Sequence, residues 1–314
     1  MGNMPETIAP DIRDRKTITH EDVLGLNFIR KPSKFYFRGH FREGLRSRII
    51  QILDPRDVRI ETRGVMREGI RRYPLARPLR MLRIFRRPVA ALNDLKDEIL
   101  NYQILQEHLP AAYFAASSEF LVDYEKPGGR EIVLCGLQKF VDGESLDPWN
   151  PRILESVKAY YRTRAPREHT DPEAFAARKV NVLQQHTQAV IRHLKNMAHK
   201  TRRIPDLAGI GNILFTLSAT IHLVDINNIS RISVDSAIPI DDKGYPACDK
   251  SIEALALLER GVLGRPVDSQ EELYRIFLNP ERMRRVRKIE KKFHARIARG
   301  DYPSPEKTGL TTNA

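Results

Sequence analysis

The sequence has few of the residues and segments on which several classes of protein depend. Only two cysteines, Cys135 and Cys248, occur among its 314 residues, which excludes a disulfide framework and a cysteine-rich metal cluster. No apolar run approaches the roughly 20 residues that a helix needs to span a bilayer. Residues 1–10 have neither the cationic start nor the apolar run of a secretory signal. From these absences we expect a soluble protein of the cytoplasm without a transmembrane segment.

Acidic residues are scarce over one stretch of the chain, and this stretch carries the whole positive excess. The formal net charge is +13 and the isoelectric point is near 9.8. Between Arg30 and Arg87 the sequence contains eighteen Lys and Arg residues and five Asp and Glu residues, a difference equal to the net charge. Such a stretch indicates either a solvated basic face or a surface for an anionic partner, such as nucleic acid, a lipid surface or a phosphate-rich ligand.

Hydrophobic residues make up 41% of the sequence, enough for a sizeable core, and their spacing predicts the elements of the first half. Short apolar runs favour strands or short helices at residues 35–37 and 48–53. Residues 58–62 alternate apolar and polar side chains, as a half-buried strand does, and residues 79–85 form a further strand. Apolar residues at helical spacing predict a helix over residues 92–108: Leu95, Ile99, Tyr102 and Leu105.

After residue 108 the pattern changes from mainly strands to mainly helices. We expect strands at residues 120–122 and 131–138, joined by a turn that contains two glycines. Apolar residues three or four positions apart predict helices over residues 153–161, 175–200, 251–263, 271–277 and 280–299. The last helix carries seven Lys and Arg residues between positions 282 and 292. We interpret it as a docked helix with a solvated basic face, and the alternative is a surface for an anionic partner.

The stretch of residues 204–228 carries the densest group of candidate site residues. Asp206 and Asn212 flank a turn with two glycines, and two apolar runs separated by a polar turn predict a hairpin that ends on Asp225. Such a hairpin holds Asn212 and Asp225 near each other, and an amide oxygen with a carboxylate suits Mg²⁺. Asp206 is placed to accept a proton from a hydroxyl group or to orient it. The alternative is an ordinary hairpin with solvated polar ends.

The order and spacing of these residues resemble the protein-kinase-like superfamily, in the form of an atypical bacterial-type member. That family has a catalytic-loop Asp, a metal-binding Asn, a hairpin and a metal-binding Asp in this order. The resemblance implies ATP and Mg²⁺ as cofactors, with Asp206 as the catalytic residue and Asn212 and Asp225 as the metal ligands. Three features depart from the family pattern. Ile204-Pro205 replaces the usual His-Arg, the Asp-to-Asn interval is one residue longer, and Ile226-Asn227 replaces the common Phe-Gly.

The resemblance also implies a nucleotide site in the first half of the chain. Arg83 stands at the position of the family's phosphate-binding lysine, although its planar fork differs from a lysine's geometry. Glu98, on the helix that follows, stands at the position that pairs with that lysine. The alternative is that both are surface charges. The backbone of a hinge would hydrogen-bond the adenine, at residues Gln138, Lys139, Phe140 and Val141.

These observations predict an α+β, two-lobed protein-kinase-like fold. We expect a polar lead-in at residues 1–27 that is either disordered or a short helix, a small β-rich N-lobe with one key helix at 28–137, a hinge and a shortened, mainly helical C-lobe at 138–300, and a disordered tail at 301–314. The expected function is ATP- and Mg²⁺-dependent phosphoryl transfer to a hydroxyl of an unidentified acceptor. Two alternatives stay open. One is a pseudokinase that binds nucleotide as a sensor or scaffold, and the other is a protein that binds nucleic acid or lipid through the basic stretch.

Overall fold

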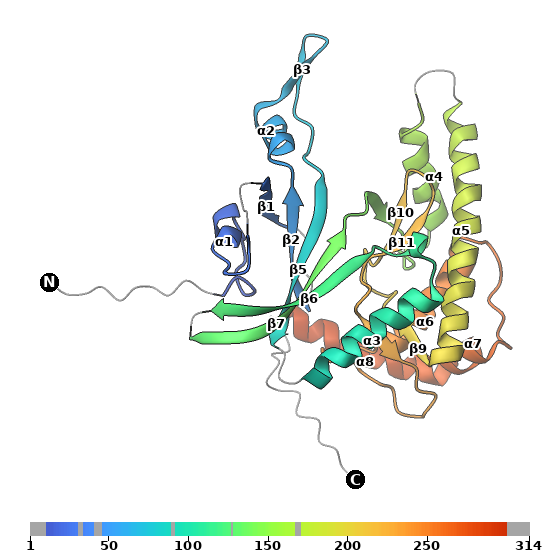
Figure 1. Ribbon diagram of the computed structural model, residues 1–314. Coiled ribbons are helices and arrows are strands. Elements are labelled where there is room, and N and C mark those ends of the chain that lie inside the picture. The colour runs from blue at the N-terminus through green and yellow to red at the C-terminus, as the bar shows by residue number, and fades with distance from the viewer. Residues whose placement is uncertain are drawn as a thin grey trace. The chain divides into compact units, whose positions relative to one another are not determined.

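The computed structural model has a mixed α+β architecture (Figure 1). It describes residues 11–30, 34–40, 46–88, 92–126, 128–166 and 171–299, so the predicted tail at 301–314 lies outside the described residues. The chain divides into two compact units, the first made of Met1–Ile99 and Ala116–Phe140 and the second of Leu100–Ala115 and Val141–Ala314. The chain therefore passes for the last time from the first unit to the second between Phe140 and Val141.

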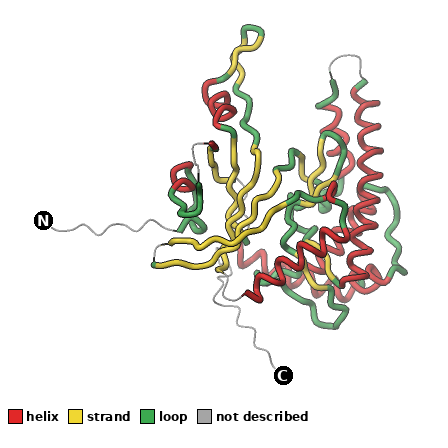
Figure 2. The backbone as a smooth tube through the Cα atoms, in the orientation of Figure 1, coloured by secondary structure: helices red, strands yellow, loops and turns green. Residues whose placement is uncertain are grey.

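A five-stranded antiparallel sheet forms the centre of the first unit (Figure 2). In spatial order its strands are β1 (Tyr36–Gly39), β2 (Ser47–Leu53), β5 (Pro78–Pro88), β7 (Gly129–Lys139) and β6 (Ser117–Lys126). The predicted strands at 48–53, 79–85, 120–122 and 131–138 are confirmed. Ile50, Ile84 and Val133 form part of a buried cluster on this sheet.

The described part of the lead-in, residues 11–27, packs against this sheet. Ile12, Ile18 and Val23 belong to the same buried cluster as the strand residues. Helix α1 (His20–Leu24) begins with a capping box, in which Thr19 and the third helical residue exchange hydrogen bonds. The lead-in thus contributes apolar side chains to the core of the first unit.

The segment between β2 and β5 holds an element that we predicted wrongly. Residues 58–62 form part of helix α2 (Pro55–Arg63) rather than a strand. The side chain of Asp54 accepts a hydrogen bond from the N–H of Arg56 at 2.8 Å, and Pro55 occupies the first helical turn. A capping residue and an N-terminal proline are strong helix-start signals, and here they outweigh a short apolar alternation. Strands β3 (Val65–Arg67) and β4 (Ile70–Arg72) then form a small hairpin.

Helix α3 (Leu92–His108) connects β5 to β6 and has the bounds that its apolar spacing predicts. A single 3₁₀ turn, η2 (Ala111–Tyr113), follows it. Residues 92–99 of α3 belong to the first unit and residues 100–108 to the second.

The second unit is mainly helical and contains two small sheets. The three-stranded sheet has the order β11 (Ile221–Leu223), β10 (Ile213–Thr216) and β8 (Gly143–Ser145), and the two-stranded sheet pairs β9 (Arg203–Pro205) with β12 (Ile229–Arg231). The helices are α4 (Ile153–Thr163), α5 (Pro172–Thr201), α6 (Ala247–Gly261), α7 (Glu272–Phe277) and α8 (Pro280–Ala298). All five were predicted. The apolar stripe of α5 is buried in one cluster with α6, the β10–β11 hairpin and β9.

The structure also describes the surroundings of the two cysteines and the length and polarity of the helices. Cys135 in β7 and Cys248 in α6 are both buried free thiols, and burial raises the pKa of each to about 12. Among the helices that the structure describes, none is both long and apolar enough to cross a bilayer.

Candidate active site

Two short strands place the first candidate carboxylate. Helix α5 ends at Arg202, whose backbone adopts left-handed dihedral angles (φ 53°, ψ 39°), and the chain then enters β9. Strand β9 pairs with β12 so that Pro205 lies opposite Ile229. Asp206 therefore lies beside Asn228 at one end of this ladder. The N–H of Asp206 donates to the carbonyl of Asn228 at 2.8 Å, and Asn228 Nδ2 donates to Asp206 Oδ2 at 2.8 Å.

The hairpin of β10 and β11 places the other two candidate residues. Ile213 lies opposite Leu223, so Asn212 and Val224 stand at the open end of the hairpin. The N–H of Val224 donates to the carbonyl of Asn212 at 2.9 Å, and Asp225 follows directly. The hairpin thus carries Asn212 and Asp225 at the same end, and both side chains are partly buried.

A side-chain hydrogen bond joins the hairpin to the loop that carries Asp206. Asn212 Nδ2 donates to the backbone carbonyl of Asp206 at 3.0 Å, and the N–H of Asn212 donates to the carbonyl of Gly209 at 3.0 Å. Glycine at position 209 leaves room for the side chain of Asn212, because a Cβ there would lie 2.6 Å from Asn212 Nδ2. Since Nδ2 is engaged in this way, Oδ1 is the atom of Asn212 that can bind a cation.

The surroundings of Asp206 change its acid–base behaviour. Burial is the largest influence and raises the pKa of its carboxyl group, and the negative charge of Asp225 raises it further. The N–H of Ala208, which donates to Asp206 Oδ1 at 2.9 Å, and the positive charge of Lys243 oppose this rise. The result is a pKa of about 6 instead of 3.8. The carboxylate is mostly ionised at pH 7 yet titrates close to neutrality, as an effective general base does.

Helix α6 and the segment before α4 hold the loop that follows Asp206. The N–H of Leu207 donates to Ser251 Oγ in α6 at 3.1 Å, and the indole Nε1 of Trp149 donates to the carbonyl of Ala208 at 2.9 Å. Lys250 Nζ lies 4.0 Å from the centre of the Trp149 ring, which is a cation–π contact. The fold of the second unit therefore sets the position of this loop.

The side-chain oxygen atoms at the end of the hairpin are of the types that bind a magnesium ion. Mg²⁺ is commonly bound by one or two carboxylates together with waters and substrate phosphates, and Asp225 and Asn212 supply one carboxylate and one amide oxygen. The repulsion between Asp206 and Asp225, which raises the pKa of Asp206, is relieved by a nearby cation. Within the described ranges, no group of three or more His, Cys, Asp or Glu side chains is placed to hold a metal.

In the first unit, the predicted phosphate-binding arginine has a carboxylate partner that the sequence does not suggest. Arg83 in β5 and Glu119 in β6 both lie opposite Gly136 of β7, the strand between them. Arg83 Nη2 lies 2.8 Å from Glu119 Oε1, and their side chains are 6% and 10% exposed. A Cβ at Gly136 would lie 2.3 Å from Glu119 Oε2, so glycine leaves room for this pair. Glu98 has its Oε1 at 3.7 Å from Nη1 of Arg46, and its pairing with Arg83 stays a prediction.

The predicted hinge residues lie at the end of β7. Gln138 is within the sheet and pairs with both neighbouring strands. The N–H of Lys139 donates to the carbonyl of Ala116 at 2.8 Å, so this donor is already used. Phe140 and Val141 follow the strand and stand on either side of the boundary between the two units. Of the four residues predicted to form the hinge, these two lie outside the strand, and their role in binding a ligand stays a prediction.

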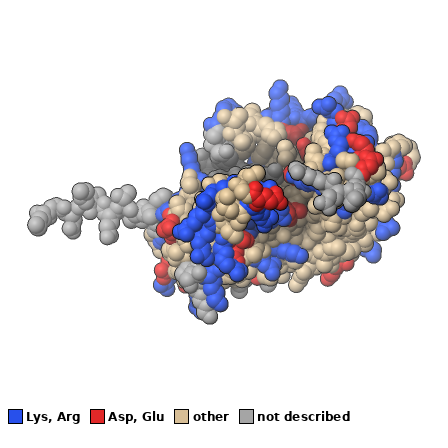
Figure 3. Space-filling view, turned by 90° about the horizontal axis from the view of Figure 1, so that it is seen from above, with Lys and Arg blue, Asp and Glu red and all other residues tan. Residues whose placement is uncertain are grey.

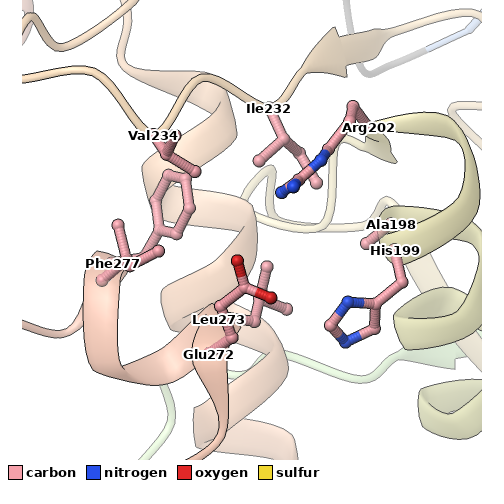
Figure 4. A pocket seen from close by; sticks show the side chains of 9 residues that line it. Ala198, His199, Arg202, Ile232, Val234, Glu272, Leu273 and Phe277 are labelled. Carbon is pink, nitrogen blue, oxygen red and sulfur yellow. The ribbon is translucent and has the colours of Figure 1, made fainter.

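A small pocket of the second unit is lined by none of the predicted site residues. Figure 4 shows it between the end of α5, the chain after β12 and α7, with His199, Arg202 and Glu272 among the side chains around it. Its volume of about 10 Å³ is close to the space that a single water molecule needs. This pocket is too small to hold a nucleotide.

Comparisons with known proteins leave the family open. No protein-family model matches the chain, and no curated protein matches its sequence. The resemblance therefore depends on the residues and elements described above.

Sequence reasoning missed three residues that shape these sites. Asn228 binds Asp206 across a strand pair of only three residues on each side, which is too short to produce a visible periodicity. Trp149 lies between the predicted strand at 131–138 and the predicted helix at 153–161, where the sequence pattern predicts no element, although its indole holds the loop after Asp206. Glu119 meets Arg83 across an intervening strand, and spacing along the chain does not reveal such a contact.

Proposed function

We propose that this chain transfers a phosphoryl group from ATP to the hydroxyl group of an acceptor molecule. The observation that carries the proposal is the convergence of Asp206, Asn212 and Asp225. The β9–β12 ladder and the β10–β11 hairpin each hold part of this group, and the hydrogen bond from Asn212 to Asp206 joins them. A residue that takes or orients the acceptor proton, next to an Asn and an Asp that bind Mg²⁺, is the arrangement that kinases use.

Asp206 takes the proton of the acceptor hydroxyl in this proposal. The N–H of Ala208 and the side chain of Asn228 each donate to one of its carboxylate oxygens, which fixes the direction of the group. Asp225 and Asn212 would hold Mg²⁺, which neutralises phosphate charge when it is bound. Transfer of this kind depends on positioning and charge neutralisation, so the loss of Asp225 should reduce the rate by orders of magnitude.

The order of the elements along the chain supports the same proposal. Strand β5 is followed by helix α3, by strands β6 and β7, by residues 138–141, by helices α4 and α5, and then by the hairpin of the candidate site. This is the order of strand, helix, two strands, hinge, helix and catalytic hairpin that the resemblance implies.

A second function, nucleotide binding without transfer, is favoured by one observation. Arg83 stands where the resemblance places a phosphate-binding cation, but its guanidinium is almost fully buried and paired with Glu119. Its charge is partly neutralised before any phosphate arrives. A chain with this pair would bind Mg²⁺ and nucleotide through the second unit and serve as a sensor or scaffold.

The test is thermal melting of the protein with ATP alone, with Mg²⁺ alone and with both, followed by measurement of ATP turnover. A ligand at 100 times its dissociation constant stabilises the native state by about 2.7 kcal/mol, which raises the melting temperature of a protein of this size by about 5 °C. We expect this shift only with ATP and Mg²⁺ together, and we expect Asp225→Ala to abolish it.

Asp235→Ala is the matched control, because Asp235 is an exposed carboxylate on the chain that follows β12. This variant should keep the shift of the wild type. A shift without turnover under any acceptor condition would favour the second function. A shift that survives Asp225→Ala, or turnover at the wild-type rate in that variant, would contradict the proposed site.

A further inference from the structure

Helix α2 and the β3–β4 hairpin form an arm that extends from the ends of β2 and β5 (Figure 1). The hairpin turns at Glu68 and Gly69, both with left-handed backbones (φ 50° and 76°), as a tight two-residue turn requires. All ten residues from Met66 to Leu75 are exposed. None of the residues of α2 is buried either, so the arm contributes little to the core of the first unit.

The arm is strongly cationic, and all of its positive charge comes from arginine. Residues 55–80 contain eight arginines, no lysine and three acidic residues. Among the described residues, Arg59, Arg63 and Arg67 form no ion pair within 4.0 Å. Lys and Arg side chains gather on the face that Figure 3 shows. A guanidinium differs from an ammonium in that it binds phosphate oxygens in a bidentate manner and is weakly hydrated.

The same arm exposes four large apolar side chains within ten residues. Met66, Ile70, Tyr73 and Leu75 are 55%, 59%, 61% and 75% exposed. Single exposed apolar residues are ordinary on a protein surface, but four of them within one short exposed segment make that segment a candidate interaction site. In the hairpin register Met66 lies opposite Arg71 and Ile70 lies opposite Arg67, so each face of the hairpin carries one apolar and one arginine side chain. The tip therefore presents apolar side chains beside guanidinium groups.

We propose that this arm docks on an anionic membrane surface. The arginines contact lipid phosphates and headgroups, while the apolar side chains at the tip enter the boundary between headgroups and acyl chains. Cationic residues beside exposed Met, Ile, Leu and Tyr are the combination that a charged interface stabilises. Nucleic acid would also attract the arginines, but the bases of a duplex are stacked on one another, so contact with Met66, Ile70 or Leu75 would first cost unstacking energy. The proposal does not depend on phosphoryl transfer, because every residue that carries it lies in the first unit.

The test is sedimentation of the full chain with vesicles that contain about 30% phosphatidylserine in phosphatidylcholine, at about 0.1 M salt. The first variant, R63A/R67A/R72A, removes three cations, and the second, M66S/I70S, removes two apolar side chains at the tip. The matched control, R284A/R287A/K288A, removes three exposed cations from α8. All of the replaced side chains are exposed, so each variant should melt at the wild-type temperature.

We expect the wild type to bind these vesicles and not pure phosphatidylcholine. One basic residue near an anionic surface is worth roughly a fivefold change in affinity, so R63A/R67A/R72A should weaken binding roughly 100-fold. M66S/I70S should weaken it roughly tenfold through the lost apolar contact, and the α8 variant should bind like the wild type.

Three results would overturn the proposal. The first is a wild type that does not sediment with anionic vesicles. The second is equal weakening by the arm and α8 triple variants, which would show attraction by total charge. The third is tight binding of a short DNA duplex that M66S/I70S leaves unchanged, together with weak vesicle binding, which would make the arm a nucleic-acid surface.

Discussion

Replacing Asp206 with asparagine should stabilise the second unit at neutral pH, although it removes the proposed general base. The carboxyl group of Asp206 is buried beside Asp225, and its pKa is raised from 3.8 to about 6. A carboxyl group whose pKa is raised by folding favours the folded state when it is protonated. This contribution is fully present below pH 3.8 and is lost as the pH rises through 6. Asparagine carries no charge at any of these pH values.

The magnitude follows from the difference between the two pKa values. One pKa unit corresponds to about 1.4 kcal/mol, so ionisation of Asp206 lowers the folding stability by about 3 kcal/mol. Asparagine also loses one of the hydrogen bonds that Asp206 accepts, because its amide group meets either Ala208 N–H or Asn228 Nδ2. That loss costs about 1 kcal/mol and does not depend on pH. The effect of Asp206 ionisation, which depends on pH, can therefore be measured separately from the cost of the lost hydrogen bond, which does not.

The assay is urea unfolding of wild type and Asp206→Asn between pH 4 and pH 8, followed by fluorescence of Trp149, the single tryptophan. Trp149 lies in the same unit as Asp206, so it reports the relevant transition. The stability of the variant relative to the wild type should rise by about 2.5 kcal/mol from pH 4 to pH 7, because a small part of the effect is already present at pH 4. In an Asp225→Asn background the rise should be smaller, because the charge of Asp225 is the second cause of the raised pKa.

A stability difference that stays constant across this pH range would refute the reasoning, because it would show that Asp206 has its ordinary pKa in the folded protein. Millimolar Mg²⁺ should also reduce this pH-dependent difference when Asp206→Asn is compared with the wild type, but not when both proteins carry Asp225→Ala. An equal effect of Mg²⁺ in both backgrounds would show that Asp225 does not bind the ion.

Two further predictions concern Gly209 and the buried pair of Asp249 and Arg282. Gly209→Ala should displace the side chain of Asn212, since a Cβ there would lie 2.6 Å from Nδ2. It should abolish the melting shift with ATP and Mg²⁺ while costing only about 1 kcal/mol of stability, and an unchanged shift would contradict the role of Asn212. Asp249 is fully buried, with its Oδ1 2.5 Å from Arg282 Nε. Asp249→Ala should lower the free energy of unfolding by about 3 kcal/mol because it leaves a buried charge unpaired, and urea unfolding with a loss below about 1 kcal/mol would show that Arg282 finds other partners.

The long helices could be predicted from the sequence because each contains several turns of apolar spacing. Helix α3 has the predicted bounds Leu92–His108, and α5 extends the predicted range by only a few residues at its ends. The β10–β11 hairpin was also predicted, because its two apolar runs are separated by a short polar turn. These patterns are local, so they do not depend on which distant segments come together.

The errors and omissions have specific physical causes. Residues 58–62 alternate like a strand, but the cap at Asp54 and the proline after it start a helix. The pairs Asn228–Asp206 and Glu119–Arg83 depend on strand register between segments that are more than twenty residues apart. Spacing within one segment carries no information about such contacts, so the sequence pointed to Asp206 and Arg83 without the partners that orient them.

The chemistry of the two cysteines makes the proposed arm open to direct labelling. Thiols with pKa values of about 12 are present as thiolate in fewer than about one molecule in ten thousand at pH 7.5, and only the thiolate reacts with maleimides. A new cysteine on the surface, such as Glu68→Cys at the turn of the hairpin, would therefore be labelled alone in the otherwise native chain. A polarity-sensitive dye at that position would report directly whether the tip leaves water when vesicles are added.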